Sequence, residues 1–283
     1  MTTDRNPQAE QMGDESMARN LKFQAEAIWP QERALFDRYA LTGELRILDL
    51  GCGTGEITRR LAERYPGARI LGIDILEGNL AIARRDSARV SDRVRYETGD
   101  AFALAIPDAH FDLVVCRHMS QAVPDFAAAL DEIGRVLKPG GWLHLLSEDY
   151  AMLRMPRGAR DPDRFWVDTA LPYLESIGCD GRIGRHTAPL MERRGYVDLA
   201  VDYVIVDTLR VSRAVFGGIL RAWRDGYVEP LSAASGRDND DVRADFDAMI
   251  ADIETPPNYA VWHVPVISGR KDPRQSGDTV RPA

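Results

Sequence analysis

The 283-residue chain is predicted to be an α/β protein with a mostly parallel sheet covered by helices on both faces. Two observations predict this class. Between residues 46 and 146, short apolar segments alternate with segments whose apolar residues recur at helical spacing, which is typical of successive strand–helix–strand units. The segment 111–116 is hydrophobic almost without interruption, as expected for a strand that is buried on both faces of a sheet.

The expected elements follow one another in a regular order. The strands are expected at 46–50, 69–73, 93–97, 111–116 and 142–146, and the helices between them at 56–65, 77–87 and 125–137. The last of these helices should end at Lys138-Pro139-Gly140-Gly141, because proline and glycine interrupt helical hydrogen bonding. Two further strands are expected near 201–206 and 260–268.

The remaining segments are expected to form a lid. Both insertions flanking the strand at 201–206 are longer than one crossover helix needs. Long insertions commonly build a lid or a substrate pocket. Extra structural packing would also explain them. Pro30 should interrupt the N-terminal helices, and Pro172 should kink a helix at 165–177. The expected division is a disordered N-terminus at 1–15, lid helices at 16–40, a domain at 41–270 with helical insertions at about 151–195 and 208–258, and a disordered tail at 271–283.

Composition and charge argue against several classes of protein. The net charge of −8 opposes nucleic-acid binding, which needs a clustered positive field. No segment approaches the ~18 consecutive apolar residues that cross a membrane. Three widely spaced cysteines favour reduced thiols in a cytoplasmic protein, and the histidines lack metal-ligand spacing. We therefore expect no nucleic acid, membrane or metal partner, while the oligomeric state is not predicted.

A glycine-rich loop predicts a cofactor site. Gly51, Gly53 and Gly55 alternate between the first strand and its helix, and the missing side chains let the backbone turn sharply and let a flat, polar cofactor approach closely. Asp74 follows the second strand, where a carboxylate can accept hydrogen bonds from a ribose diol. The chain is therefore expected to bind a nucleoside-containing cofactor, although these features alone would also fit a nicotinamide or flavin enzyme.

Further motifs narrow the choice. The loop reads Gly-x-Gly-x-Gly and is preceded by Asp49, Gly99-Asp100-Ala101 follows the third strand, Cys116-Arg117-His118 ends the fourth, and Leu137-Lys138-Pro139-Gly140-Gly141 precedes the fifth. In this order and spacing, residues 44–147 resemble the class I S-adenosylmethionine-dependent methyltransferases, in the small-molecule group that includes the ubiquinone and menaquinone enzymes.

The resemblance implies a Rossmann-like, seven-stranded, mostly parallel sheet in which strand seven runs antiparallel between strands five and six. Pro265 fits this arrangement poorly, because a proline in a central strand removes a hydrogen-bond donor. A bulge at Pro265, or a strand that ends before it, would resolve the conflict.

The resemblance also implies which residues bind S-adenosylmethionine. The expected cofactor-binding residues are Gly51, Cys52 and Gly53 around the methionine portion and ribose, Asp74 on the ribose hydroxyls, Ile75 and Asn79 at the adenine ring, Asp100 and Ala101 at the adenine edge, and the backbone carbonyl of Arg117 at the amino group. Plainer explanations remain open: packing glycines, a helix-capping Asp74, and an exposed salt bridge for the Arg117 side chain.

His118 is the expected catalytic residue. It lies at the carboxyl end of a central strand, where open parallel sheets bind their ligands. An imidazole there can take a proton from an acceptor hydroxyl or amine near neutral pH, although it could instead only shape the pocket. Gln121 could orient the acceptor, and Glu148, Asp149 and Tyr150 are weaker candidates at the same edge of the sheet.

The expected function is S-adenosylmethionine-dependent methyl transfer to a small molecule. O-methylation ranks first because of His118, with N- or C-methylation possible. The donor methyl is already activated, so the enzyme mainly aligns the reactants and excludes water. The alternatives are a methyltransferase that acts on a peptide or protein, which would need an open groove, a non-catalytic S-adenosylmethionine-binding protein, and, more remotely, a nicotinamide oxidoreductase.

Overall fold

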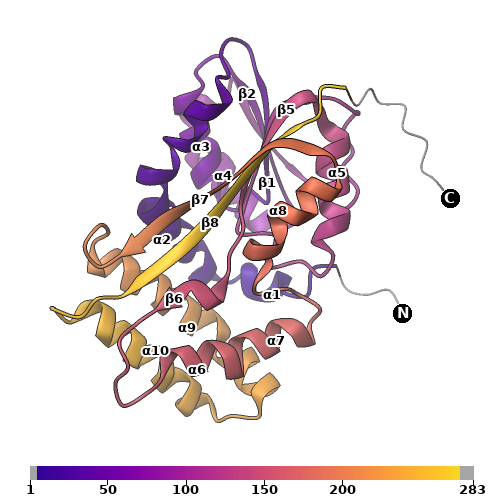
Figure 1. Ribbon diagram of the computed structural model, residues 1–283. Coiled ribbons are helices and arrows are strands. Elements are labelled where there is room, and N and C mark those ends of the chain that lie inside the picture. The colour runs from indigo at the N-terminus through magenta and orange to yellow at the C-terminus, as the bar shows by residue number, and fades with distance from the viewer. Residues whose placement is uncertain (1–4, 275–283) are drawn as a thin grey trace.

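The computed structural model describes residues 5–274, and its centre is one eight-stranded sheet. Five parallel strands lie in the order β3-β2-β1-β4-β5, and β8 pairs antiparallel with β5 and continues the sheet (Figure 1). Both β7 and the short β6 pair with β8. The strands are β1 (Arg46–Leu50), β2 (Arg69–Asp74), β3 (Val94–Thr98), β4 (Phe111–Arg117), β5 (Leu137–Leu146), β6 (Leu153–Arg154), β7 (Tyr196–Asp207) and β8 (Val261–Lys271).

This topology confirms the predicted α/β class. The last strand runs antiparallel between the fifth strand and the strand predicted at 201–206. The eighth strand is β6, a two-residue pairing that the sequence pattern did not suggest. Pro265 remains within β8, with neither the bulge nor the early end that we expected.

Pro265 is tolerated because it lies in a gap of the hydrogen-bond ladder. Pairing of β8 with β5 ends at Leu146 opposite Val266, and pairing with β6 begins at Leu153 opposite Trp262. The Pro265 carbonyl accepts a hydrogen bond from the Ser147 amide at 3.2 Å. In an antiparallel strand the N–H and C=O of one residue point to the same side. The missing Pro265 donor therefore faces a stretch with no paired strand.

Helices cover both faces of the sheet. The helices α3 (Glu56–Arg64) and α4 (Glu77–Asp86) pack on one face, and α5 (Phe126–Val136) and α8 (Ile183–Arg193) on the other. Alternate residues of β4 enter the two cores, with Leu113 and Val115 in one and Val114 and Cys116 in the other. This two-sided burial explains the nearly continuous apolar pattern of β4.

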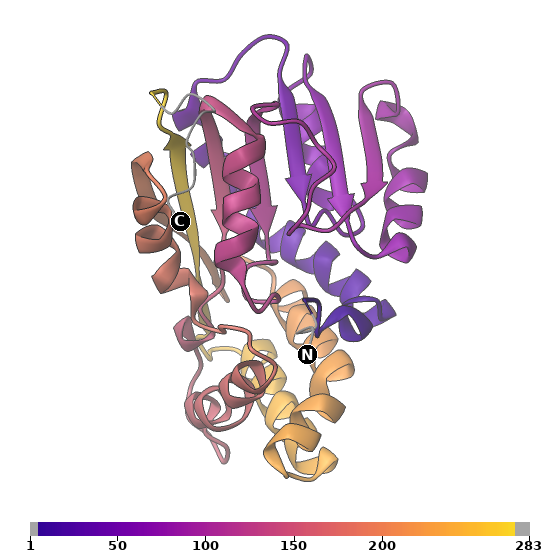
Figure 2. The ribbon, with the colours of Figure 1, turned by 90° about the vertical axis from the view of Figure 1, so that its right-hand side faces the viewer.

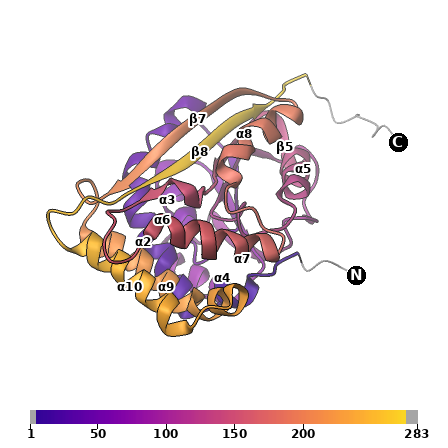
Figure 3. The ribbon, with the colours of Figure 1, turned by 60° about the horizontal axis from the view of Figure 1, so that its bottom comes forward.

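The other helices form a layer beyond the carboxyl ends of the parallel strands (Figures 2 and 3). Phe216, Phe246 and Trp262 are fully buried in the core of this layer. Its first elements are α1 (Ala9–Met12) and α2 (Glu15–Glu32). A continuous helical segment follows, made of α6 (Pro162–Phe165), a π-helical turn (Trp166–Ala170) and α7 (Leu171–Ser176). The pair α9 (Arg213–Ser235) and α10 (Asn239–Glu254) completes the layer. No helix of residues 5–274 is long and apolar enough to cross a membrane.

We expected Pro30 to interrupt the N-terminal helix, but the helix continues through it. Helix α2 continues to Glu32, and a 3-10 turn (Leu35–Tyr39) follows it. Pro30 is exposed while Ile28 and Glu32 on either side are buried, so packing on both sides of the proline outweighs its lost hydrogen bond. At Pro172 the helix also continues, and the π-helical turn immediately precedes this proline, as is common where helical bonding is perturbed.

The chain ends are more ordered than the polar composition suggested. Residues 5–15, part of the segment expected to be disordered, contain α1 and the start of α2. A hydrogen bond from the Tyr227 hydroxyl to the Gln8 side chain, 2.8 Å long, links this segment to α9. Lys271, expected to begin a disordered tail, is the last residue of β8. The rest of those two expectations, at 1–4 and 275–283, lies outside the described residues.

Candidate active site

A cavity with about 810 Å³ of empty space lies at the carboxyl ends of β1, β2 and β4. This is the edge at which the sequence predicted a cofactor. Its lining includes eight of the ten predicted site residues, namely Gly51, Gly53, Asp74, Ile75, Asn79, Ala101, Arg117 and His118. The structure therefore brings together side chains and backbone from four separate strand ends.

The glycine loop has the conformation that its composition predicts. Gly51, Gly53 and Gly55 have φ values of 71°, 52° and 73°, which residues with a side chain rarely adopt. The Asp74 carboxylate accepts hydrogen bonds from the Gly53 amide at 2.7 Å and the Leu76 amide at 2.9 Å. Burial raises the pKa of Asp74, although these amides partly oppose the shift. Asp74 thus fixes the loop while facing the cavity.

Cys52 and Asp100 are absent from the cavity lining. The Cys52 thiol points towards β2, since a Cβ built on Gly72 would lie 2.9 Å from its Sγ, and burial raises the pKa of this thiol well above its ordinary value. The Asp100 carboxylate accepts from the Phe102 amide at 2.9 Å and lies 3.9 Å from the Arg5 guanidinium. Both side chains are therefore engaged outside the cavity.

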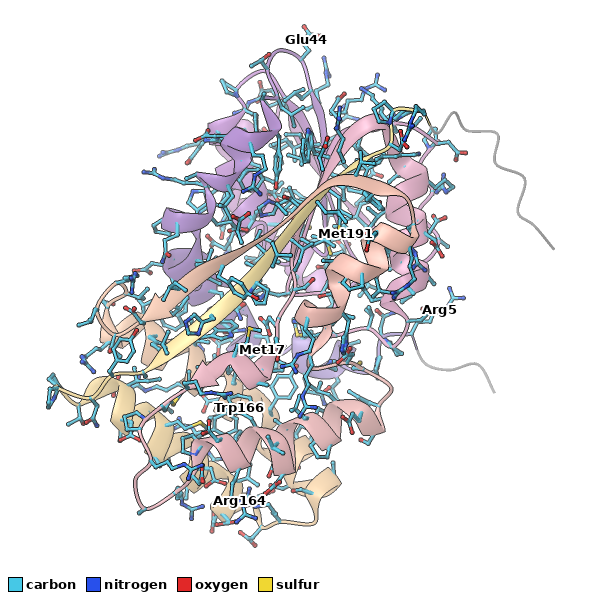
Figure 4. All side chains as sticks on the ribbon, in the orientation of Figure 1. Arg5, Met17, Glu44, Arg164, Trp166 and Met191 are labelled. Carbon is cyan, nitrogen blue, oxygen red and sulfur yellow. The ribbon has the colours of Figure 1, made fainter. Side chains whose placement is uncertain are left out.

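A second cavity, with about 670 Å³ of empty space, adjoins the first and lies between the sheet and the helical layer. Trp166 and Met17, labelled in Figure 4, lie between the sheet and the lower helices and are part of its wall. Its aromatic lining residues are Tyr150, Trp166, Tyr173, Trp223, Tyr227 and Phe246, and the residues that line both cavities are Gln8, Met12, Leu21, His118 and Ala122. The two cavities therefore share one wall.

His118 and Glu148 form a pair at the boundary between the cavities. The Nδ1 atom of His118 hydrogen-bonds to Oε1 of Glu148, and the Gln24 side-chain amide donates to the same oxygen at 3.4 Å. The Nε2 atom of His118 is buried and has no partner among the described residues. Because the carboxylate accepts the Nδ1 proton, Nε2 is left as the basic nitrogen.

The neighbours of His118 restrict its position. Its φ is 55°, an uncommon backbone conformation for a residue other than glycine. The Gln121 side chain donates to the His118 carbonyl at 2.8 Å, so Gln121 supports the backbone here and also lines the second cavity. Of the weaker candidates, Asp149 instead binds Arg185 with bonds of 2.6 and 3.0 Å.

Tyr150 supplies part of the aromatic wall. Its ring stacks on Trp166 with centroids 5.5 Å apart and planes 5° from parallel. Burial, together with the nearby Glu148 charge, raises the pKa of Tyr150 well above its ordinary value. The hydroxyl therefore stays protonated and cannot act as a base near neutral pH.

The Arg117 side chain is buried and does not form the exposed salt bridge that we considered. Its Nε donates to Glu32 Oε1 at 2.9 Å, and that oxygen also lies 3.0 Å from Nε2 of His144. Burial opposes ionisation of Glu32, but the Arg117 charge and the His144 hydrogen bond outweigh it, so the pKa of Glu32 is lowered. Glu32 is a site residue that sequence reasoning missed, because it lies 85 positions from Arg117.

Comparison with known proteins identifies the family of this chain. Residues 48–145 match a family model described as a methyltransferase domain. The chain is 41% identical over 160 residues to demethylmenaquinone methyltransferase of Thermus thermophilus, an alignment that covers 56% of this chain and 70% of the relative. It is 32% identical over 181 residues to ubiquinone biosynthesis O-methyltransferase of Leptothrix cholodnii, covering 57% of this chain and 76% of the relative.

A solved structure shows the same fold. Phosphoethanolamine N-methyltransferase 2 of Haemonchus contortus, in complex with S-adenosylmethionine, superposes with a TM-score of 0.57 at 19% identity, covering 93% of this chain and 60% of that chain. The chain belongs to the class I S-adenosylmethionine-dependent methyltransferase family. It is an enzyme that uses S-adenosylmethionine as its methyl donor and a small molecule as its acceptor.

The first cavity fits this cofactor. Gly53 has a φ of 52°, which disfavours any side chain in the loop, and a Cβ built there would lie 2.5 Å from Leu21 Cδ1, so Leu21 would have to shift. Asp74 provides carboxylate oxygens, and the lining is otherwise largely apolar, as a nucleoside site requires.

No group of three or more histidine, cysteine or acidic residues that could hold a metal ion occurs within residues 5–274.

Proposed function

We propose that the protein methylates a hydroxyl group on an uncharged, ring-containing small molecule, with His118 as the general base. The observation that carries this proposal is the unpaired Nε2 atom of His118, buried at the boundary of the two cavities. A base at that place can reach an acceptor in the second cavity while the donor occupies the first.

The reaction needs one proton transfer, from the acceptor hydroxyl to the protein. When bound, S-adenosylmethionine supplies a methyl group activated by a positively charged sulfur. The Nε2 atom of His118 would accept the proton of the acceptor hydroxyl, and the oxygen would use its electron pair to bond to the methyl carbon. The bond from that carbon to sulfur would break, with its electron pair left on sulfur, and the demethylated cofactor would leave as a neutral thioether. Glu148, bonded to Nδ1, fixes the imidazole tautomer and stabilises the imidazolium after it takes the proton. The helical layer covers the second cavity and so limits the access of water to the reacting groups.

The wall of the second cavity supports an acceptor that is uncharged and flat. The residues that line it include six aromatic side chains and no arginine or lysine among those described. A phosphate or carboxylate would have no cation there, and burying an unpaired charge is costly. Two relatives are named for methylation in menaquinone and ubiquinone synthesis, which supports a hydroquinone or catechol ring. C-methylation of such a ring is the second candidate.

The roles of the cofactor-binding residues belong to the same proposal. Gly51 and Gly53 receive the methionine arm and ribose, Asp74 accepts from the ribose hydroxyls, and Ile75, Asn79 and Ala101 contact the adenine. Cys52 contributes through its backbone and Asp100 at the rim, since both side chains are engaged elsewhere. The Arg117 carbonyl faces the amino group. Lining of the first cavity by seven of these nine residues supports the assignment.

A cytoplasmic location is also part of the proposal. Its support is the three cysteines, which are all free and buried, since free thiols are typical of a reducing compartment. The net charge of −8 supports the absence of a nucleic-acid partner. Cell fractionation followed by immunoblotting tests the location, and recovery of the protein outside the cytoplasm would contradict it.

The test of the base is substitution of His118 and Glu148. We expect His118→Ala to lower the rate of methyl transfer at saturating S-adenosylmethionine by ~100-fold or more, and Glu148→Gln by ~10-fold or more. Initial rates with a panel of hydroquinones and catechols measure this. Because neither substitution removes a proposed cofactor contact, calorimetric affinity for S-adenosylhomocysteine should stay unchanged.

The matched control is His186→Ala, a histidine on α8 whose side chain is 54% exposed and pairs with Asp180. It should retain the full rate with the same panel. A nearly normal rate in His118→Ala would rule out the base assignment. Transfer of the methyl group to a ring carbon, detected in the product by NMR, would favour the second candidate.

A further inference from the structure

We propose that the Arg117 side chain, held in place by Glu32, binds the α-carboxylate of S-adenosylmethionine. This role differs from the backbone contact assigned to Arg117 above. The inference rests on the proposed placement of the cofactor in the first cavity. It adds a cofactor-binding side chain, Arg117, and a positioning residue, Glu32, that the strand and loop motifs did not reveal.

Charge complementarity supports the assignment. The cofactor carries a carboxylate at the end of its amino-acid arm, and this group loses water when it enters the cavity. Arg117 is the only arginine or lysine among the described residues that line the first cavity. A carboxylate buried without a cation costs several kcal/mol, so the amino-acid end should lie on the Arg117 side.

The order of the strands supports the same orientation. Asp74 ends β2 and Arg117 ends β4, and β1 lies between these two strands. With the ribose at Asp74, the methionine arm crosses the glycine loop at the end of β1 and reaches the end of β4. His118, the next residue, faces the second cavity. This course brings the transferred methyl group to the boundary between the cavities and leaves the carboxylate in the first cavity, beside Arg117.

The guanidinium has hydrogen-bonding capacity left for a ligand. Among residues 5–274, the Arg117 guanidinium forms one ion pair, from Nε to Glu32. Its Nη2 atom is buried and has no hydrogen-bond partner among the described residues. Buried donors of this kind are normally satisfied, and a carboxylate is the partner that matches an arginine fork.

A buried network fixes the guanidinium. Glu32, fully buried on α2, accepts from Arg117 and lies 3.0 Å from His144 Nε2. The other ring nitrogen of His144 lies 2.6 Å from the Tyr39 hydroxyl. A side chain held on one edge by such a network is preorganised, so little conformational entropy is lost when a ligand binds its other edge.

The experiment compares two ligands that differ in the amino-acid arm. S-adenosylhomocysteine carries the carboxylate, whereas 5′-methylthioadenosine has the same nucleoside and lacks the arm. We expect the double variant Arg117→Gln/Glu32→Gln, which removes both charges of the buried pair, to weaken S-adenosylhomocysteine binding by about 10- to 100-fold. Binding of 5′-methylthioadenosine should change by less than about twofold. Isothermal titration calorimetry measures both affinities.

The single variant Glu32→Gln tests the positioning role. It should weaken S-adenosylhomocysteine selectively, whereas a role limited to folding would weaken both ligands. The comparison variant is Asp74→Asn, at the nucleoside end, which should weaken both ligands together. Equal effects on both ligands in the double variant, or unchanged S-adenosylhomocysteine affinity, would overturn the inference. If Asp74→Asn changes neither affinity, the cofactor placement itself fails, which separates the two claims.

Discussion

At the scale of single residues, Gly184 positions the carboxylate that orients His118. Its amide donates to the Glu148 carbonyl at 2.9 Å. A Cβ at this position would lie 2.6 Å from the Ser147 carbonyl oxygen and 3.1 Å from that of Glu148. Because both are backbone atoms at the end of β5, neither can move aside as a flexible side chain would. The start of α8 can therefore approach this loop only with glycine.

Gly184→Ala is predicted to push the Glu148 backbone away from His118. We expect the free energy of unfolding to fall by about 1–3 kcal/mol, and the rate with the hydroquinone panel to fall further than cofactor binding. Denaturant titration and initial rates measure these effects. The control is Gly78→Ala on α4, where no atom lies within 4 Å of the added Cβ and stability should hold or rise. Equal stability of the two variants would contradict the prediction.

At the scale of elements, the helical segment from Pro162 to Ser176 supplies much of the second cavity. Its central π-helical turn begins at Trp166. This indole stacks on Tyr150 and meets Trp223 edge-on at 5.9 Å. Three chain segments thus meet at Trp166, which lines the second cavity and is absent from the lining of the first. π-helical turns occur frequently at functional sites.

Trp166→Leu is predicted to weaken acceptor binding selectively. Loss of the flat ring should raise the KM for the hydroquinone acceptor by about 10-fold, since aromatic stacking and lost area contribute about 1–2 kcal/mol. Affinity for S-adenosylhomocysteine should not change. The matched control Trp166→Phe keeps a ring and removes an indole N–H that has no partner among the described residues, so its KM should stay close to that of the original protein. If Trp166→Leu also weakened the binding of S-adenosylhomocysteine, the two cavities would not be separate binding sites.

At the scale of the whole molecule, a buried acid at the centre of the sheet makes stability depend on pH. Asp49 in β1 is 2% exposed and accepts a hydrogen bond from the Thr58 hydroxyl at 2.6 Å. Burial raises the pKa of Asp49 to about 6, and the Thr58 bond only partly opposes this. The folded protein therefore holds the Asp49 proton to a higher pH than the unfolded chain does.

Folding stability should therefore decrease as the pH rises through this range. Between pH 4 and pH 6 the unfolded chain releases the Asp49 proton while the folded protein retains it, which favours unfolding. Relative to Asp49→Asn, which cannot titrate, the free energy of unfolding of the original protein should fall by up to about 3 kcal/mol from pH 4 to pH 7. Urea titrations of both proteins at several pH values measure the difference. A difference that is constant with pH would contradict the raised pKa.

The parts of the molecule that sequence reasoning predicted are those encoded locally. The alternation from Arg46 to Leu146 and the glycine loop each depend on neighbouring residues, and the structure places them as predicted, except that β5 begins at Leu137 and not at residue 142. Pairings between distant segments were not predictable. The Glu32–Arg117 contact joins residues 85 positions apart, and the aromatic wall gathers Tyr150, Trp166 and Trp223 from three segments. Pro30 was misjudged because packing outweighs local propensity.

The division between the two cavities also determines how much the names of sequence relatives indicate about this enzyme. The family match ends at residue 145, and the six aromatic residues of the second cavity all follow it, from Tyr150 to Phe246. A substitution among these six aromatic residues would change the second cavity without altering any residue of the stretch that matches the family model. A relative's name is therefore a good guide to the methyl donor and a weaker guide to the compound that receives it.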